Sequence, residues 1–246
     1  MLQFENGTVL ADKNYLDAHL LKEGMYVRVG KTDNTAAGEY STAGGINNVI
    51  TGTGSHAVGG YTQALGPWSH TEGWATEAHG NSAHAEGNTS KAIGDYTHVE
   101  GWLNNASGKG SHIEGCANTS FQEATWSHIE GYENKASGNS SHIEGYSNIT
   151  SGFASHAEGS FVQSLADSSH AEGFGTIASG KYSHAGGYHT EALVDCQTVV
   201  GRCNAQETEA LFIVGCGSAD TTGENKVVQN CFSTGYNGTE AYIKVG

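Results

Sequence analysis

Histidine and glutamate are the residues of this chain whose spacing could support chemistry. Ten of the thirteen histidines follow one another at intervals of 14 residues, with one interval of 16 between His112 and His128. A glycine stands three residues after each of the ten. An imidazole beside a carboxylate can move protons, hold a metal ion or form a buried ion pair. The eight pairs that carry both groups are His70 and Glu72, His84 and Glu86, His98 and Glu100, His112 and Glu114, His128 and Glu130, His142 and Glu144, His156 and Glu158, and His170 and Glu172.

Catalysis is the less favoured role for these pairs. Glycoside hydrolysis uses two carboxylates, but a catalytic site interrupts a pattern, whereas these glutamates recur in eight successive units. The serine that precedes most of the histidines should point to the opposite face of a strand, so a Ser-His-Asp arrangement is not expected. Three histidines from three chains could hold a metal ion on an axis, but glutamates that bond the imidazoles would satisfy them without one. We therefore expect no enzymatic activity, no metal and no other cofactor.

The spacing itself predicts the fold. A 14-residue unit is too short for a helix and its return, so it indicates one coil of a solenoid with two short strands. Threonine, serine or asparagine commonly stands six residues after the histidine, alanine eight after and glycine ten after. Thr42, Thr198 and Phe212 continue the histidine positions beyond both ends of the series. We expect an all-β roll of about thirteen coils over residues 41–224, with 27–40 as a further degenerate coil and a longer loop between His112 and His128.

Alternation along the strands predicts which side faces inward. Serine and the small or aliphatic residue after each histidine should line the interior, and histidine and glutamate should face outward. So narrow an interior buries little area, too little to offset the ordering of each coil. The outward face becomes apolar near its ends, at Val58, Val200, Phe212 and Val214. We expect this face to be the seam of a homotrimer; a solvated face of ordinary surface residues is the alternative.

Aromatic residues recur four places after the histidine, at the turn. A column of rings could stack on sugars, and packing between neighbouring coils is the alternative reading. The candidate glycan contacts are Trp74, Trp102, Tyr132, Tyr146, Phe174 and Tyr188.

Composition narrows the partners and the compartments. The formal charge of −15 opposes binding to nucleic acid, and the chain has no apolar run suited to membrane insertion. Five cysteines without a CxxC pair suggest thiols that are reduced. Residues 1–40 are expected to form an N-terminal cap or attachment segment with a short helix over 11–22, residues 41–224 the repeat domain, and residues 225–246 a C-terminal strand or tip segment.

The repeats SHTEG, THVEG, SHIEG and SHAEG, each followed by a Thr/Asn-x-Ala-x-Gly half, resemble the head repeats of trimeric autotransporter adhesins. The resemblance covers residues 41–222 and implies a trimeric, left-handed parallel β-roll. The His/Glu variant and the C-terminal segment are more similar to bacteriophage tail and receptor-binding proteins. This implies a homotrimeric tail fibre on the virion, with tail or baseplate proteins and a host-surface glycan or protein as partners. The alternatives are a bacterial adhesin head at the cell surface and a processed fragment of an autoproteolytic tail spike.

Overall fold

The computed structural model describes residues 2–3, 9–11, 27–29, 34–219 and 226–246. The chain divides into two compact units, Met1–Ala106 and Ser107–Gly246. All regular structure in the described residues is β, with no helix among them. The helix expected over 11–22 lies outside the described residues, apart from Ala11, which ends a strand.

The strands of the first unit are β1 (Leu2–Gln3), β2 (Val9–Ala11), β3 (Val27–Val29), β4 (Thr35–Ala36), β5 (Thr42–Ile46), β6 (Val49–Ile50), β7 (His56–Gly60), β8 (Gln63–Ala64), β9 (His70–Trp74), β10 (Glu77–Ala78), β11 (His84–Ala85), β12 (Lys91–Ala92), β13 (His98–Val99) and β14 (Asn105–Ala106). Those of the second unit are β15 (His112–Ile113), β16 (Thr119–Ser120), β17 (His128–Tyr132), β18 (Lys135–Ala136), β19 (His142–Tyr146), β20 (Ile149–Thr150), β21 (His156–Ser160), β22 (Gln163–Ser164), β23 (His170–Phe174), β24 (Ile177–Ala178), β25 (His184–Tyr188), β26 (Glu191–Ala192), β27 (Thr198–Arg202), β28 (Ala210–Cys216), β29 (Asn230–Tyr236) and β30 (Ala241–Val245).

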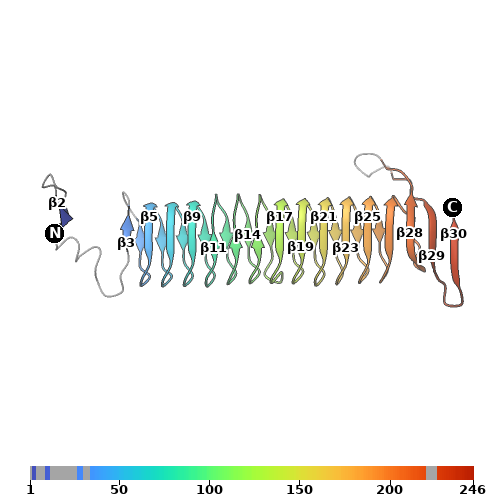
Figure 1. The fold of residues 1–246 in the computed structure, drawn as a ribbon, viewed down its shortest axis with the longest axis horizontal. Coiled ribbons are helices and arrows are strands. Elements are labelled where there is room, and N and C mark those ends of the chain that lie inside the picture. The colour runs from blue at the N-terminus through green and yellow to red at the C-terminus, as the bar shows by residue number, and fades with distance from the viewer. Residues whose placement is uncertain (1, 4–8, 12–26, 30–33, 220–225) are drawn as a thin grey trace. The chain divides into compact units, whose positions relative to one another are not determined.

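Each coil contributes one strand to each of two parallel sheets, and successive coils stack within each unit (Figure 1). Within each unit the histidine strands form one sheet, in the order β3-β5-β7-β9-β11-β13 in the first unit and β15-β17-β19-β21-β23-β25-β27-β28 in the second. Every residue pairs with its counterpart in the next coil, so His128 lies opposite His142 and Ile129 opposite Ile143. The expected β-solenoid is confirmed.

The number of coils differs from the expected thirteen. The described residues contain twelve coils with two strands, six in each unit, and the first consists of β3 and β4, whose strands pair with those of the next coil as the sequence predicted. At the other end, β27 and β28 continue the histidine sheet in parallel but have no counterpart in the second sheet. The spacing of Phe212 and Gly215 matched the repeat although the chain does not complete a coil there.

The interior is narrow and filled by small or aliphatic side chains, as the alternation predicted. The residue after each histidine is fully buried, including Ile129 and Ile143, and so is the alanine of most second strands. The serines before the histidines also point inward, and the Ser141 hydroxyl donates a hydrogen bond to the Gly138 carbonyl at 2.8 Å. Buried hydroxyls in this position therefore close the turn that precedes each histidine strand.

Asparagines at the position six residues after histidine join neighbouring coils. The Asn148 Nδ2 group donates to the carbonyls of Glu144 at 2.6 Å and Gly159 at 2.9 Å, and its Oδ1 accepts from the Val162 amide at 2.8 Å. Asn148 is fully buried, so one side chain satisfies three backbone groups at a corner where the sheets do not. Asn134 makes the equivalent bonds one coil earlier.

The glycine three residues after each histidine is required by its backbone and by close packing. Gly145 has φ +106°, and a Cβ added there would lie 2.1 Å from the Gly159 carbonyl oxygen. No L-residue fits this corner without moving the next coil. The glycine of the pattern His-x-Glu-Gly thus lets neighbouring coils approach closely at a fixed point of each strand.

The 16-residue interval is confirmed as a longer loop. β16 begins seven residues after His112, as in other coils, and seven residues, 121–127, then separate it from β17 where five separate β18 from β19. His112 still pairs with His128. The two additional residues therefore lengthen one turn without changing the register.

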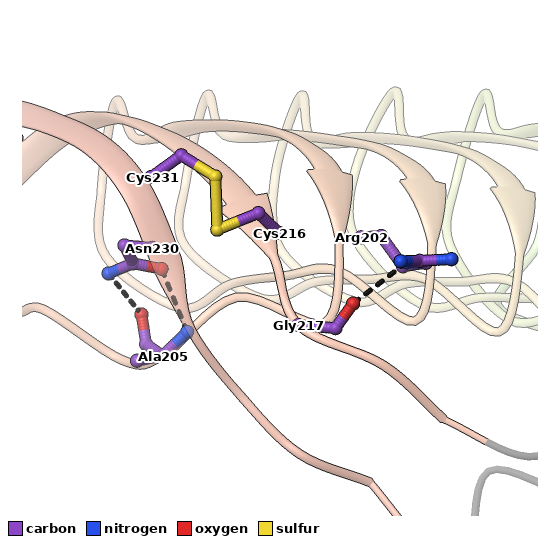
Figure 2. The surroundings of a disulfide bond; sticks show 6 residues. All are labelled: Arg202, Ala205, Cys216, Gly217, Asn230 and Cys231. Carbon is purple, nitrogen blue, oxygen red and sulfur yellow. Dashed lines mark hydrogen bonds between the residues drawn. A yellow bond between two sulfur atoms is a disulfide. The ribbon is translucent and has the colours of Figure 1, made fainter. Parts of the chain in front are cut away.

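The end of the second unit departs from the repeat. β28 pairs in antiparallel fashion with β29, and β29 with β30. Cys216 and Cys231 form a disulfide between β28 and β29, which corrects the expectation of reduced thiols for this pair (Figure 2). Asn230 exchanges two hydrogen bonds with the backbone of Ala205, at 2.8 and 3.0 Å. These contacts fix the hairpin against the chain that precedes β28.

The Glu207 carboxylate provides a further anchor for this hairpin. It accepts hydrogen bonds from Asn230 at 2.7 Å, from Ser233 at 2.9 Å and from the Lys244 ammonium at 2.9 Å. Burial raises the pKa of Glu207, but the hydrogen bonds outweigh it and the net pKa is lowered. One carboxylate therefore ties β29 and β30 to the preceding turn.

Candidate functional site

The histidine–glutamate face is the outward side of the histidine sheet in each unit. The histidines lie on their strands in register, and their rings stack on one another. Ring centroids are 4.7 Å apart between His70 and His84, and 4.8 Å apart between His142 and His156. The face comprises His70, Glu72, His84, Glu86, His98 and Glu100 in the first unit, and His112, Glu114, His128, Glu130, His142, Glu144, His156, Glu158, His170 and Glu172 in the second.

The glutamates lie beside the histidines, as the sequence predicted. Some contact the histidine of their own coil, such as Glu144, whose carboxylate is 3.4 Å from His142 Nε2. Others contact the next coil, such as Glu172, 3.4 Å from His184 Nε2. The Nε2 atoms of His142, His156 and His170 are shielded from solvent yet have no hydrogen bond of good geometry. None of the sixteen residues is buried in the single chain.

The charged form of the imidazoles is disfavoured on this face. Burial, followed by the neighbouring imidazoles, lowers the pKa of His84, His156 and His170, while the adjacent glutamates oppose the shift. His70 behaves in the same way. The hydrogen bond with Glu114 raises the pKa of Glu130. For these four histidines, burial within the stack therefore favours the neutral imidazole.

Metal coordination would require these rings to tilt. His142, Glu144 and His156 place their ligand atoms within 4.8 Å of one another, and so do His156, Glu158 and His170. An ion held at about 2.1 Å needs two imidazole nitrogens no more than about 4.2 Å apart, with lone pairs that converge. Stacked rings with an interplanar angle of 12° direct their lone pairs side by side instead. The arrangement suits contact between extended surfaces better than chelation.

The ends of the face carry apolar side chains. Val58 stands opposite Glu72 in the sheet register and is 39% exposed. In the second unit Val200 and Val214 continue the glutamate positions, and Phe212 continues the histidine positions.

The predicted aromatic column contacts itself from coil to coil. Tyr132 stacks on Tyr146 with centroids 5.5 Å apart, and Phe174 stacks on Tyr188 at 5.4 Å. Trp74 packs edge-on against Tyr61 at 4.9 Å. Trp74 and Trp102 stay 52% and 55% exposed. The column has therefore a packing role in the fold and exposed ring surface in addition.

Sequence reasoning missed three features. The disulfide and the Glu207 anchor depend on the antiparallel pairing of β29 with β28, and the repeat does not predict this pairing. The third is a second set of exposed aromatic residues, which includes Trp68 and Trp126. Its signal was the tripeptide Trp-Ser-His, which occurs at both positions.

No protein-family model matches the chain, and no curated protein does. Among the residues that the structure describes, there is no helix with the length and apolar character needed to cross a membrane.

Proposed function

We propose that this chain forms a homotrimer of left-handed β-rolls and serves as an attachment protein, a tail fibre or spike that holds a phage or phage-like particle on a host surface. The role is structural and adhesive rather than enzymatic. The histidine–glutamate face, with its apolar ends, is the trimer seam of this proposal.

The observation that carries the proposal is the regularity of a half-exposed face. His142 and His156 stack in register, and neither is buried in the single chain. Contact with solvent does not require a surface histidine to recur at the same position of every coil. Contact with a second copy of the chain does require this recurrence, because each coil then meets the same partner surface. The glutamate carboxylates supply acceptors that a desolvated imidazole requires.

The thin core supports the same proposal. Apart from Ile129, Ile143 and similar aliphatics, the interior consists mostly of alanine, serine, threonine and asparagine. Alanine and serine remove little apolar area from water, and each ordered residue costs about 1–2 kcal/mol of backbone entropy. Burial of a further face between copies adds the area that a single coil lacks.

The oligomeric state tests the seam. Light scattering should give three times the 25.7 kDa chain mass. A His142→Glu variant adds a carboxylate beside Glu144 and should dissociate the assembly. Lys135→Glu makes a charge change on an exposed residue of the other sheet and should leave it intact. A folded single chain at micromolar concentration would refute the seam.

Binding to cells tests the attachment role. Fluorescently labelled, assembled protein should bind the surface of susceptible bacteria and compete with infection. Assembled protein that binds no bacterial surface in a panel of strains would contradict an attachment role while leaving the trimer intact.

A further inference from the structure

A second edge of each unit carries aromatic residues where folding does not favour them. The turn position two residues before the histidine position has a left-handed backbone, and several coils place tryptophan or tyrosine there with φ of 57–58°. A side chain in this region costs about 1–2 kcal/mol relative to the right-handed conformation. We call this set the second aromatic edge: Tyr40, Trp68 and Tyr96 in the first unit, and Trp126 and Tyr182 in the second.

Burial does not compensate for this cost. Trp68 is 63% exposed and Trp126 is 61% exposed. Tryptophan stabilises a fold mainly through the large area that it buries, and most of that area stays in water here. Residues that are both strained and exposed are concentrated at functional sites.

Glycine in the preceding coil turns each indole into a platform. A Cβ added to Gly54 would lie 2.4 Å from two ring carbons of Trp68, and one added to Gly110 would lie 2.3 Å from the Trp126 ring. Each ring therefore rests on a glycine backbone that leaves room for it. The part of each indole that contacts the glycine is covered, and more than half of each tryptophan stays exposed to solvent.

A polar pair follows each platform in the next coil. The Ser82 hydroxyl donates to Asn81 Oδ1 at 2.9 Å, and the Ser140 hydroxyl donates to Asn139 Oδ1 at 2.8 Å. This bond uses the carboxamide oxygen and leaves its two N–H donors to other partners. The first unit therefore contains one module of Gly54, Trp68, Asn81 and Ser82, and the second contains another of Gly110, Trp126, Asn139 and Ser140.

A flat apolar ring beside planar amide donors matches a sugar. One face of a pyranose ring presents C–H groups and its rim presents hydroxyls, so a ring stacked on indole can accept hydrogen bonds from a neighbouring carboxamide. We propose that each Gly-Trp-Asn-Ser module binds one pyranose unit of a neutral surface glycan. The proposal deepens the attachment role and rests on that role for the source of the glycan, not for the geometry of the module.

Charge favours a neutral sugar over an acidic one. The Asp95 carboxylate accepts a hydrogen bond from the backbone N–H of Asn81 at 2.8 Å, so it places negative charge beside the first module. The chain as a whole carries a formal charge of −15. The Asp95 carboxylate would repel a sialylated or sulphated glycan at short range, and the net charge of the chain would repel it at long range.

The test is a glycan array probed with assembled protein. It should carry neutral glucose, galactose, mannose and N-acetylglucosamine oligosaccharides beside sialylated and sulphated ones, with titration of the best neutral oligosaccharide. The double variant Trp68→Ala/Trp126→Ala should weaken binding about tenfold or more. The double variant Gly54→Ser/Gly110→Ser should also weaken binding, because both indoles remain but the new side chains displace them from the glycine backbone. Serine is compatible with a left-handed backbone in this fold, since Ser82 and Ser140 already adopt it.

The matched control is Ile93→Ala/Leu193→Ala, which removes two exposed apolar side chains, 40% and 43% exposed, that belong to neither set of aromatic residues. It should leave the affinity for the neutral oligosaccharide unchanged. Wild-type protein that binds no neutral glycan at millimolar concentration, or that binds only acidic glycans, would overturn the proposal. So would a control variant that loses binding while the Trp68/Trp126 variant keeps it. Cell binding that persists in the Trp68/Trp126 variant would reject these modules without rejecting the attachment role.

Discussion

Replacing Gly145 by alanine should destabilise the fold in two ways, both of which glycine avoids at this position of each coil. The first is conformational, because φ at Gly145 is +106°. The second is steric, because the new Cβ would lie 2.1 Å from the Gly159 carbonyl oxygen. A carbon and an oxygen ordinarily approach to about 3.3 Å, so the two coils must separate by more than about 1 Å.

Gly238 provides the matched control. It lies in the exposed turn between β29 and β30, has φ +88°, and a Cβ there would meet nothing within 4 Å. The conformational cost alone is about 1–2 kcal/mol. Gly238→Ala should therefore reduce the free energy of unfolding by this amount.

The steric cost at Gly145 follows from the hydrogen bonds that the separation breaks. Asn134 Nδ2 donates to the Gly145 carbonyl and Asn148 Nδ2 to the Gly159 carbonyl, each at 2.9 Å. Each buried polar group left without a partner costs about 1–3 kcal/mol. Together with the conformational term, Gly145→Ala should cost about 4 kcal/mol or more.

Thermal unfolding followed by circular dichroism measures both variants. For a chain of this size the melting temperature falls by about 2–4 °C per kcal/mol, so Gly145→Ala should lose about 8–16 °C. Gly238→Ala should lose about 2–8 °C. Hydrogen exchange should show faster exchange of the amides of β19 and β21 in the first variant only. Equal losses in the two variants would refute the steric argument.

Three further outcomes are expected. Burial lowers the folded-state pKa of His84 and His156, so the unfolded chain binds more protons than the folded chain once the pH falls below about 6.5. The melting temperature should therefore fall as the pH is lowered from 7.5 through 6.5, and an increase on acidification would contradict the shift. The Cys216–Cys231 disulfide closes a loop with a sequence separation of 15 residues, so its reduction should destabilise the C-terminal hairpin by about 3 kcal/mol. Limited proteolysis should then cleave within β29, and unchanged protection would argue against the crosslink. Asn148→Ala should lower the free energy of unfolding, measured by chemical denaturation, by about 2–4 kcal/mol. Asn148→Thr should lower it less, because threonine occupies the equivalent position of other coils, as Thr176 does. Equal losses in the two variants would count against the asparagine hydrogen bonds.

The repeat made most of the fold predictable. A residue that recurs every 14 positions must occupy the same place in every coil, so the inward direction of Ile129 and the outward direction of His142 followed from strand alternation. The pairing of His128 with His142 followed from the same argument. The longer turn after β16 was predictable because one interval differed from the rest.

What lay outside the repeat was not predictable in the same way. The Cys216–Cys231 pairing depends on β29 returning antiparallel to β28, a contact between segments that share no motif. The function of Trp68 depends on the absence of a side chain at Gly54, fourteen residues earlier, and only the folded register brings the two together. A pattern within one coil does not show what the neighbouring coil leaves empty.

The uniform register has a consequence for how such a chain changes over generations. Loss of residues 142–155 would join Ser141 to His156, and every remaining side chain of the second unit would keep its inward or outward direction. Loss of thirteen residues instead would reverse that direction in each strand that follows. Recombination between tandem copies of the coding repeat should therefore leave natural variants that differ by whole coils, longer or shorter in discrete steps, while the tryptophan modules and the C-terminal hairpin are inherited unchanged.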